Sequence, residues 1–190
     1  MRVIAGSARG RRLRCLNDQL VRPTKDRVKE AVFSSLGSRL PDSRVLDLFA
    51  GSGALGIEAL SRGAYAAVFV EIDRKACDLI RSNLHICGWA ESPDVRVIQS
   101  DAIRWLMDNA TGDHMFDVII ADPPYNMGFE EEILTVVSRT GILSRHGIVV
   151  MESATGLNLP EDVGGTGLCL SKSKAYGDST ISYYKNTGAL

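Results

Sequence analysis

The sequence has few of the residues that build disulfide frameworks or metal centres. Its 190 residues include four cysteines and three histidines. The cysteines form no C-x-x-C pair, and the histidines fall at no metal-ligand spacing. We therefore predict free thiols, no disulfide and no bound metal. The residues concerned are Cys15, Cys77, Cys87, Cys169, His85, His114 and His146.

A long apolar run is also missing. No segment approaches the roughly 18 consecutive apolar residues of a membrane span. Residues 1–6 carry one positive charge, and the mostly polar and basic residues 7–12 follow in place of the apolar centre of a signal peptide. With 45% hydrophobic and 24% charged residues, the composition is that of a globular protein of about one domain. We expect a cytoplasmic protein that does not contact membranes.

Acidic residues are scarce at the amino terminus. Residues 1–44 contain eleven Arg or Lys and four Asp or Glu, a balance of +7, although the whole chain has a formal net charge of −1. This segregation predicts that a basic amino-terminal region meets a polyanion, while a solvated basic face without a partner is the alternative. We divide the chain accordingly into a basic extension, 1–43, and a body, 44–190.

Two short β-rich segments open the basic extension. Residues 3–6 and 12–15 flank a Gly-rich stretch, which predicts a β-hairpin whose loop carries arginine. Further on, apolar residues recur with helical spacing from Val28 to Leu36, and Thr24 is a candidate N-cap for this helix.

Strand-like and helical segments alternate from Val45 onward. This alternation predicts an α/β fold with a mostly parallel, doubly wound sheet and helices on both faces. Residues 168–172 and 179–184, around the turn at 176–178, predict a hairpin that closes the sheet edge. The predicted strands are 45–49, 67–71, 95–99, 116–121 and 147–152, and the predicted helices are 53–61, 74–87, 101–109 and 129–139.

A glycine-rich turn follows the first strand of the body. Gly51 and Gly53 let the backbone turn tightly and approach a ligand at the switch point of the sheet. Together with Gly56 they satisfy G-x-G-x-x-G, and Glu71 lies where a dinucleotide fold keeps its ribose carboxylate. A nicotinamide oxidoreductase is therefore one interpretation, although no acid or base for hydride transfer is obvious.

Asp47 favours a different ligand at this turn. A carboxylate here would repel a pyrophosphate but attract the amino group or sulfonium of S-adenosylmethionine. In this interpretation Glu71 accepts the ribose hydroxyls, and Asp101 meets the adenine, besides serving as a possible helix N-cap. The candidate cofactor-binding residues are Asp47, Phe49, Ala50, Gly51, Ser52, Gly53, Glu71, Ile72, Asp101 and Ala102.

The tetrapeptide Asp122-Pro123-Pro124-Tyr125 directly follows an apolar predicted strand. The prolines remove two N–H donors, so the carbonyl oxygens are acceptors without a competing donor, and Asp122 supplies a further acceptor. The ring of Tyr125 can stack on a base, which is worth about 1–3 kcal/mol. This combination predicts methylation of an amine on a planar base, while an ordinary strand-ending turn is the alternative.

These motifs together resemble the class I S-adenosylmethionine methyltransferases, and specifically the bacterial RsmD family, which methylates the N2 amine of a guanine in 16S ribosomal RNA. The resemblance covers nearly the whole chain, and its amino-terminal segment is the specific part because Asp-Pro-Pro-Tyr is shared with DNA adenine methyltransferases. The segments that carry it are 2–6, 10–13, 22–30, 47–56, 122–125 and 176–179.

The resemblance implies a Rossmann-like methyltransferase with a seven-stranded sheet. Asp122, Pro123, Pro124 and Tyr125 would form the catalytic pocket, and S-adenosylhomocysteine would be the product. The substrate would be 16S rRNA within the small subunit or its assembly intermediate, with contacts to ribosomal proteins, and the enzyme would be a monomer. The residues that would contact RNA are Arg9, Arg11, Arg12, Arg22, Thr24, Lys25 and Arg27.

Two further alternatives stay open. A DNA adenine methyltransferase shares the Asp-Pro-Pro-Tyr pocket, although the chain has no room for a separate target-recognition domain. A non-catalytic RNA-binding assembly factor could also retain this fold.

Overall fold

The computed structural model describes residues 1–15, 23–109, 115–125 and 127–187, with the side chains of residues 23–25 left aside. Its strands are β1 (Arg44–Leu48), β2 (Ala66–Glu71), β3 (Val95–Gln99), β4 (Phe116–Ala121), β5 (Leu143–Ala154), β6 (Leu168–Tyr176) and β7 (Ser179–Asn186). Its helices are α1 (Pro23–Leu36), η2 (Gly37–Arg39, a 3-10 turn), α2 (Ala54–Ser61), α3 (Arg74–Cys87), α4 (Ala102–Asp108) and α5 (Phe129–Thr140).

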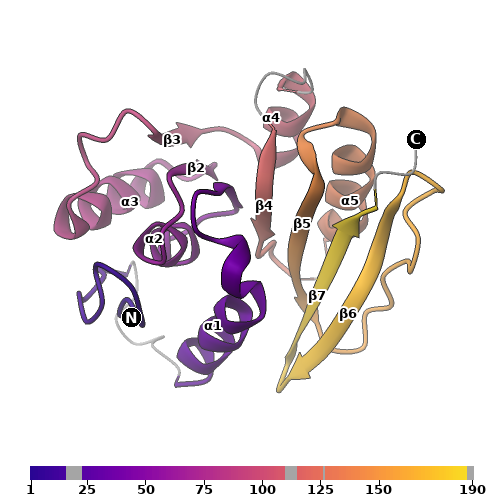
Figure 1. The fold of residues 1–190 in the computed structure, drawn as a ribbon, viewed down its shortest axis with the longest axis horizontal. Helices are drawn as coiled ribbons and strands as arrows, with labels where there is room; N and C mark the ends of the chain where they lie inside the picture. The colour runs from indigo at the N-terminus through magenta and orange to yellow at the C-terminus, as the bar shows by residue number, and fades with distance from the viewer. Residues whose placement is uncertain (16–22, 110–114, 126, 188–190) are drawn as a thin grey trace.

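One seven-stranded sheet forms the centre of the molecule (Figure 1). Its strand order is β3-β2-β1-β4-β5-β7-β6. Strands β1 to β5 are parallel, whereas β7 runs antiparallel to β5 and to β6. The predicted closing hairpin is therefore confirmed as the β6–β7 pair at the sheet edge.

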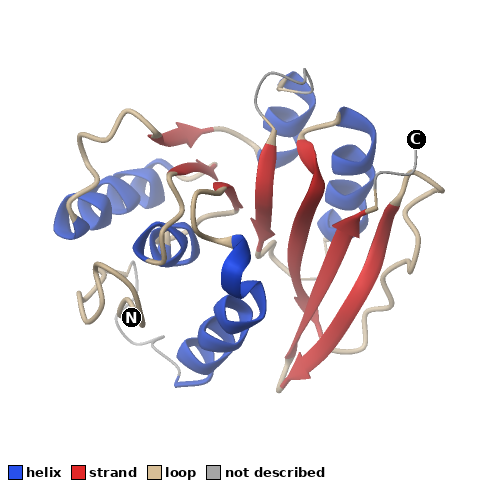
Figure 2. Ribbon diagram, in the orientation of Figure 1, coloured by secondary structure: helices blue, strands red, loops and turns tan. Residues whose placement is uncertain are grey.

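Helices cover both faces of this sheet (Figure 2). On one face, α2 and α3 pack on β2 through an apolar cluster that includes Ile57 and Phe69. On the same face, α1 packs on β4, β5 and β7 through a cluster around Phe33. The opposite face is covered by α4 and α5, with Leu106 and Ile133 fully buried. The predicted doubly wound arrangement is confirmed, and double coverage explains why β4 is almost entirely apolar.

At the amino terminus one local prediction is confirmed and one is wrong. The predicted hairpin is present, with an antiparallel bridge between Arg2 and Arg12 and backbone hydrogen bonds on either side of it, although its pairing is limited to that one bridge. Thr24 does not precede its helix, because α1 begins at Pro23. Proline is favoured at the first helical position, where its missing N–H is not needed.

Two strand ends in the body also differ from the prediction. Strand β5 is longer at both ends than the predicted 147–152. Strand β1 ends at Leu48, one residue early, because Phe49 adopts a positive φ of 55° that no strand accommodates.

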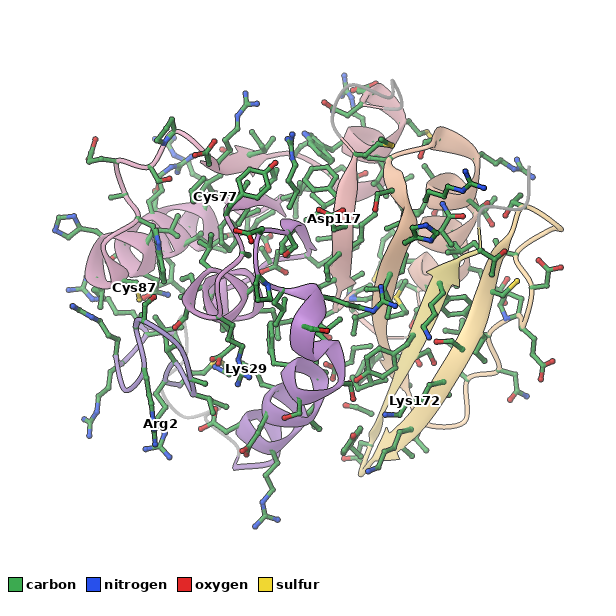
Figure 3. The ribbon with its side chains drawn as sticks, viewed as in Figure 1. Arg2, Lys29, Cys77, Cys87, Asp117 and Lys172 are labelled. Carbon is green, nitrogen blue, oxygen red and sulfur yellow. The ribbon has the colours of Figure 1, made fainter. Side chains whose placement is uncertain are left out.

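The amino-terminal hairpin is held on α2 by the buried carboxylate of Glu58. Its two oxygens accept hydrogen bonds from the backbone N–H groups of Ile4 (2.8 Å) and Ala5 (3.0 Å). They also form ion pairs with Lys29 of α1 at 3.2 Å and Arg62 at 2.8 Å. Figure 3 labels Lys29 between α1 and the hairpin. The Glu58 side chain therefore joins the hairpin, α1 and α2. The division of the chain into an extension, 1–43, and a body, 44–190, stays a prediction.

None of the helices in the described ranges is both long and apolar enough to cross a lipid bilayer.

Replacing Gly6 by alanine should loosen the hairpin from α2. Gly6 and Gly10 have nearly equal positive φ values of 83° and 85°, so alanine costs about 1–2 kcal/mol at either position. At Gly6 the added Cβ would overlap the carbonyl group of Ser61, whereas no atom lies within 4 Å at Gly10. We expect Gly6→Ala to lower the free energy of unfolding in urea by at least about 2 kcal/mol more than Gly10→Ala.

Equal losses in the two variants would show that the close contact between Gly6 and Ser61 contributes nothing to stability.

Candidate active site

The candidate cofactor and catalytic residues meet at one edge of the sheet. Strands β1, β2, β3 and β4 run parallel, so their carboxyl ends lie on the same side. Asp47, Glu71 and Asp122 stand at or directly after these ends. In open α/β sheets, ligands bind in the crevice outside the carboxyl ends, where the strand order reverses. In this sheet the order reverses between β1 and β4.

The turn after β1 has an unusual backbone. Phe49, Gly51 and Gly53 all have positive φ, at 55°, 55° and 74°. For Phe49 this left-handed conformation costs about 1–2 kcal/mol, so the surrounding structure has to hold it. Its ring packs on Phe129 at the start of α5, with centroids 5.4 Å apart. Sequence reasoning did not single out Phe129, because α5 follows β4 far along the chain.

Glu71 ties this turn to the end of β2. Its Oε2 accepts a hydrogen bond from the Gly51 N–H at 2.8 Å, and its Oε1 accepts one from the Asp73 N–H at 2.9 Å. Each carboxylate oxygen has a second lone pair, so acceptor capacity remains on this side chain. The neighbouring Ile72 is an apolar side chain with 64% of its surface exposed.

Asp47 is a buried carboxyl group beneath the turn. Only 2% of its surface is exposed, and its Oδ2 accepts a hydrogen bond from the Gly56 N–H at 2.8 Å. A Cβ at Gly56 would overlap the ring of Phe69, which explains the glycine there. The pKa of Asp47 is raised to about 8, and burial is the largest cause. The hydrogen bond from Gly56 lowers this pKa, whereas the charges of Asp122 and Glu71 raise it.

This edge of the sheet is therefore built to receive positive charge. Three carboxyl groups influence one another there, and a cation among them would favour the ionised form of Asp47. Ionised carboxyl groups there would repel a pyrophosphate, and the identity of the ligand stays a prediction. In the described part of the chain, no group of three or more His, Cys, Asp or Glu is arranged to hold a metal ion.

Asp101 follows β3 and begins α4. Its Oδ1 accepts a hydrogen bond from the Arg104 N–H at 2.9 Å, so the N-cap interpretation is confirmed. The next residue, Ala102, is buried in the core between α4 and the sheet.

The loop after β4 is anchored to the antiparallel part of the sheet. The Tyr125 hydroxyl donates to Glu152 Oε1 at 3.0 Å and lies 2.7 Å from Ser179 Oγ. Ser179 Oγ also donates to Glu152 Oε1 at 2.8 Å. Desolvation raises the pKa of Tyr125 to about 12, so the hydroxyl stays protonated. The ring remains 38% exposed, Pro123 is buried and Pro124 is exposed.

Sequence reasoning missed the role of Glu152. The predicted strand 147–152 ends at Glu152, at the same sheet edge as Asp122. This position at the strand end could have identified Glu152 as a candidate site residue.

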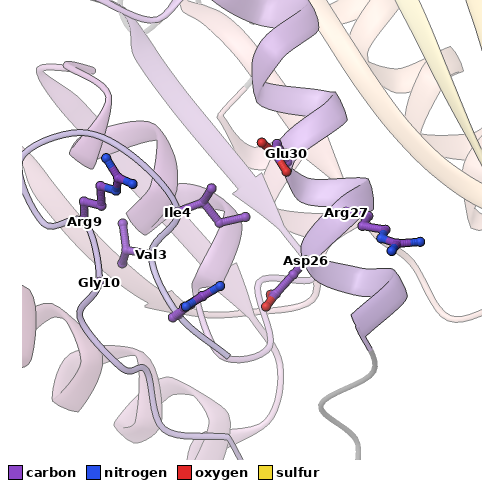
Figure 4. A pocket seen from close by; sticks show the side chains of 8 residues that line it. Val3, Ile4, Arg9, Gly10, Asp26, Arg27 and Glu30 are labelled. Carbon is purple, nitrogen blue, oxygen red and sulfur yellow. The ribbon is translucent and has the colours of Figure 1, made fainter.

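A cavity of about 450 Å³ separates the amino-terminal hairpin from α1. Figure 4 shows Arg9 on the hairpin side and Asp26 and Glu30 on the helix side, while Arg27 points away. Arg9, Arg11, Arg12 and Arg27 are exposed, and Arg11 also donates to the carbonyl oxygen of Ile86 at 2.7 Å. Of the other candidate RNA-contacting residues, Arg22 lies outside the described residues, and Thr24 and Lys25 are placed only by their backbone in α1.

Known sequences similar to this chain include ribosomal RNA methyltransferases. A family model described as "Conserved hypothetical protein 95" matches residues 1–185. Ribosomal RNA small subunit methyltransferase D of Escherichia coli strain K12 is 36% identical over 160 residues, which are 84% of this chain and 78% of that protein. The Bacillus subtilis protein YlbH, provisionally named an rRNA methyltransferase, is 39% identical over 188 residues, 99% of this chain and 100% of that protein.

Solved structures with the same architecture include two bacterial proteins. The Escherichia coli protein yhhF superposes with a TM-score of 0.85 at 33% identity, covering 99% of this chain and 98% of that one. The Haemophilus influenzae protein HI0767 superposes with a TM-score of 0.83 at 30% identity, covering 98% of both chains. The fold is therefore shared over essentially the full length.

Replacing Asp47 by asparagine should make the stability of the ligand-free protein less dependent on pH. The pKa of Asp47 rises from 3.8 to about 8 on folding, so the folded state holds a proton that the unfolded state releases between these values. The stabilisation of the folded state by this bound proton is complete below pH 3.8 and is lost as the pH rises toward about 8. Between pH 5 and pH 8, we expect the wild type to lose on the order of 2–4 kcal/mol relative to Asp47→Asn in urea unfolding.

Asp94→Asn, which changes an exposed carboxylate, serves as the control and should follow the wild type. Parallel pH profiles for the wild type and Asp47→Asn would show that Asp47 is already ionised in the ligand-free protein.

Proposed function

The chain belongs to the family described as conserved hypothetical protein 95, the RsmD family of ribosomal RNA small subunit methyltransferases. We propose that it methylates the exocyclic N2 amine of a guanine in 16S rRNA, with S-adenosylmethionine as the methyl donor. The observation that carries this proposal is the position of Asp122-Pro123-Pro124-Tyr125. The loop stands directly after β4, next to the buried carboxyl of Asp47 at the sheet edge. Asp47, which would bind a cation, thus lies next to the loop 122–125, which would bind an amine on a planar base.

The residues at the end of β1 fit S-adenosylmethionine, which when bound supplies an electrophilic methyl group on a sulfonium. Asp47 would hold the cationic methionine end, and it would release its proton on binding because a positive charge favours the carboxylate. The backbone of residues 49–53 would line the donor. Glu71 would accept from the ribose hydroxyls with its remaining lone pairs, and Ile72, Asp101 and Ala102 would surround the adenine.

The loop after β4 would position the acceptor amine. Asp122 and the carbonyl oxygen of Pro123 would accept the two hydrogens of N2, which holds the nitrogen at an attack distance of about 3–3.5 Å from the methyl carbon. The Tyr125 ring would stack on the guanine, with its hydroxyl held by Glu152 and Ser179. The methylated nitrogen is strongly acidic, so it loses its proton without a strong base.

The basic amino-terminal region would bind the RNA backbone. Arg9 lines the cavity between the hairpin and α1, and Arg12 and Arg27 are exposed on the hairpin and on α1. Contacts of this kind orient the substrate and weaken as salt rises. We infer that the protein acts in the cytoplasm as a monomer, on the small ribosomal subunit or its assembly intermediate, with ribosomal proteins contributing to recognition.

The direct experiment is transfer of a tritiated methyl group from S-adenosylmethionine to small ribosomal subunits from a strain lacking this gene, followed by nucleoside analysis. Label in N2-methylguanosine supports the proposal. Label in another nucleoside would overturn the choice of guanine, and no label on the subunits, with transfer to DNA instead, would favour the DNA adenine methyltransferase. No transfer to either nucleic acid would favour a non-catalytic assembly factor.

Two aspartate variants should separate the two halves of the site. Asp122→Ala should lower kcat on the order of a hundredfold, because the amine loses its orientation, while the Kd for S-adenosylmethionine stays near the wild-type value. Asp47→Ala should mainly raise the Kd for S-adenosylmethionine, with a smaller effect on kcat. Isothermal titration calorimetry and single-turnover methyl transfer measure the two effects, with Asp94→Ala as an exposed control.

Loss of cofactor binding in a folded Asp122→Ala variant would contradict this division of roles.

A further inference from the structure

Two lysines on the edge strand β6 lie on the face of the sheet that carries α1. Lys172 pairs with Tyr183 and Lys174 with Ile181 of β7. Directly opposite residues of an antiparallel pair share a face, and Tyr183 and Ile181 belong to the apolar cluster under α1. Both lysines are exposed. Lys172, labelled in Figure 3, therefore lies on this face close to α1.

The ammonium groups of both lysines contact neutral groups. Lys172 Nζ donates to Ser35 Oγ of α1 at 3.2 Å and lies 5.5 Å from the ring centroid of Tyr183. Lys174 Nζ lies 5.1 Å from the ring centroid of Tyr176. Among the residues that the structure describes, neither lysine forms an ion pair. Aromatic rings orient a cation without neutralising it, so these charges remain available to an anion.

This face leads from the lysines to the catalytic loop. Tyr176 pairs with Ser179, and Ser179 Oγ lies 2.7 Å from the Tyr125 hydroxyl. Successive same-face residues of a strand are about 7 Å apart, so Lys172, Lys174 and Tyr176 form a line that ends beside Tyr125.

The surroundings of this line are positive. Residues 168–176 and 31–41 contain Lys172, Lys174 and Arg39 but no acidic residue. Exposed serines at positions 34 and 35 of α1 add hydrogen-bonding groups. Glu152 lies on the same face at the catalytic end, where it accepts from Ser179 and Tyr125. Such a surface is complementary to a phosphate backbone.

We propose that the α1-side face of β6 is a second RNA-binding surface, on which Lys172 and Lys174 contact phosphates next to the modified nucleotide. In Figure 1, α1 stands between β6 and the amino-terminal hairpin, so the RNA would be held on both sides of the catalytic loop. This inference rests on the proposed function because it takes the substrate to be RNA. It extends the basic region beyond residues 1–43.

The test is the double variant Lys172→Ser/Lys174→Ser. Each phosphate contact to a single strand contributes about 0.7 to the slope of log affinity against log salt, so two lost contacts reduce affinity on the order of tenfold at 0.1 M salt. We expect the KM for the small subunit and the Kd for an rRNA fragment to rise by that factor, and the salt slope to fall by about 1.4. Lys172→Arg/Lys174→Arg should restore both values.

Arg96→Ser/Arg139→Ser is the matched control, since it removes two exposed charges on β3 and α5. It should behave as the wild type. Thermal unfolding and cofactor binding of each variant establish that the fold is intact.

Three outcomes would overturn the inference while the wild type still methylates rRNA. Unchanged RNA affinity with increased self-association would mean that the lysines only protect the edge strand. A loss seen with the subunit but not with naked RNA would assign the surface to an acidic ribosomal protein. An equal loss in the control would show a general charge effect. If the wild type itself transfers no methyl group to rRNA, the proposed function fails instead.

Discussion

The buried carboxylate of Glu58 determines how the amino-terminal part of the chain is attached to the body. It has no exposed surface, and it holds Lys29 of α1, Arg62 and two backbone N–H groups of the hairpin at once. Removing one partner of such a buried pair costs about 3–5 kcal/mol, because the other charge is left without compensation. Glu58 therefore links the hairpin to both α1 and α2, on either side of the cavity.

The parallel sheet has a comparable effect on the candidate active site. Carboxyl groups that are distant in sequence meet there because four parallel strands end at the same edge. Asp47 is buried among them at a pKa of about 8, so it is the group that a bound cation would change most. The ligand-free site keeps Asp47 protonated up to about pH 8, and a bound cation would favour its ionised form, so binding of a cationic donor would be coupled to proton release.

The antiparallel end of the sheet connects the base-binding loop to the proposed second RNA surface. Tyr125 is fixed by Glu152 from β5 and Ser179 from β7, and the same face continues along β6 to the two lysines. Turn motifs and strand periodicity reveal each of these segments separately. Their meeting depends on the register between β5, β7 and β6, which no local pattern specifies.

The sequence by itself determined the alternating α/β order, the glycine turn after β1 and the Asp-Pro-Pro-Tyr loop, because hydrophobic period and Gly or Pro geometry act over a few residues. It also determined the family, through motifs spread along the chain. Only the tertiary structure decided that Glu58 joins three segments, that Glu152 anchors Tyr125 and that the hairpin has almost no strand pairing. The contacts of Glu58 with the hairpin and of Glu152 with Tyr125 join residues about 27 to 54 positions apart, and their geometry is set by packing.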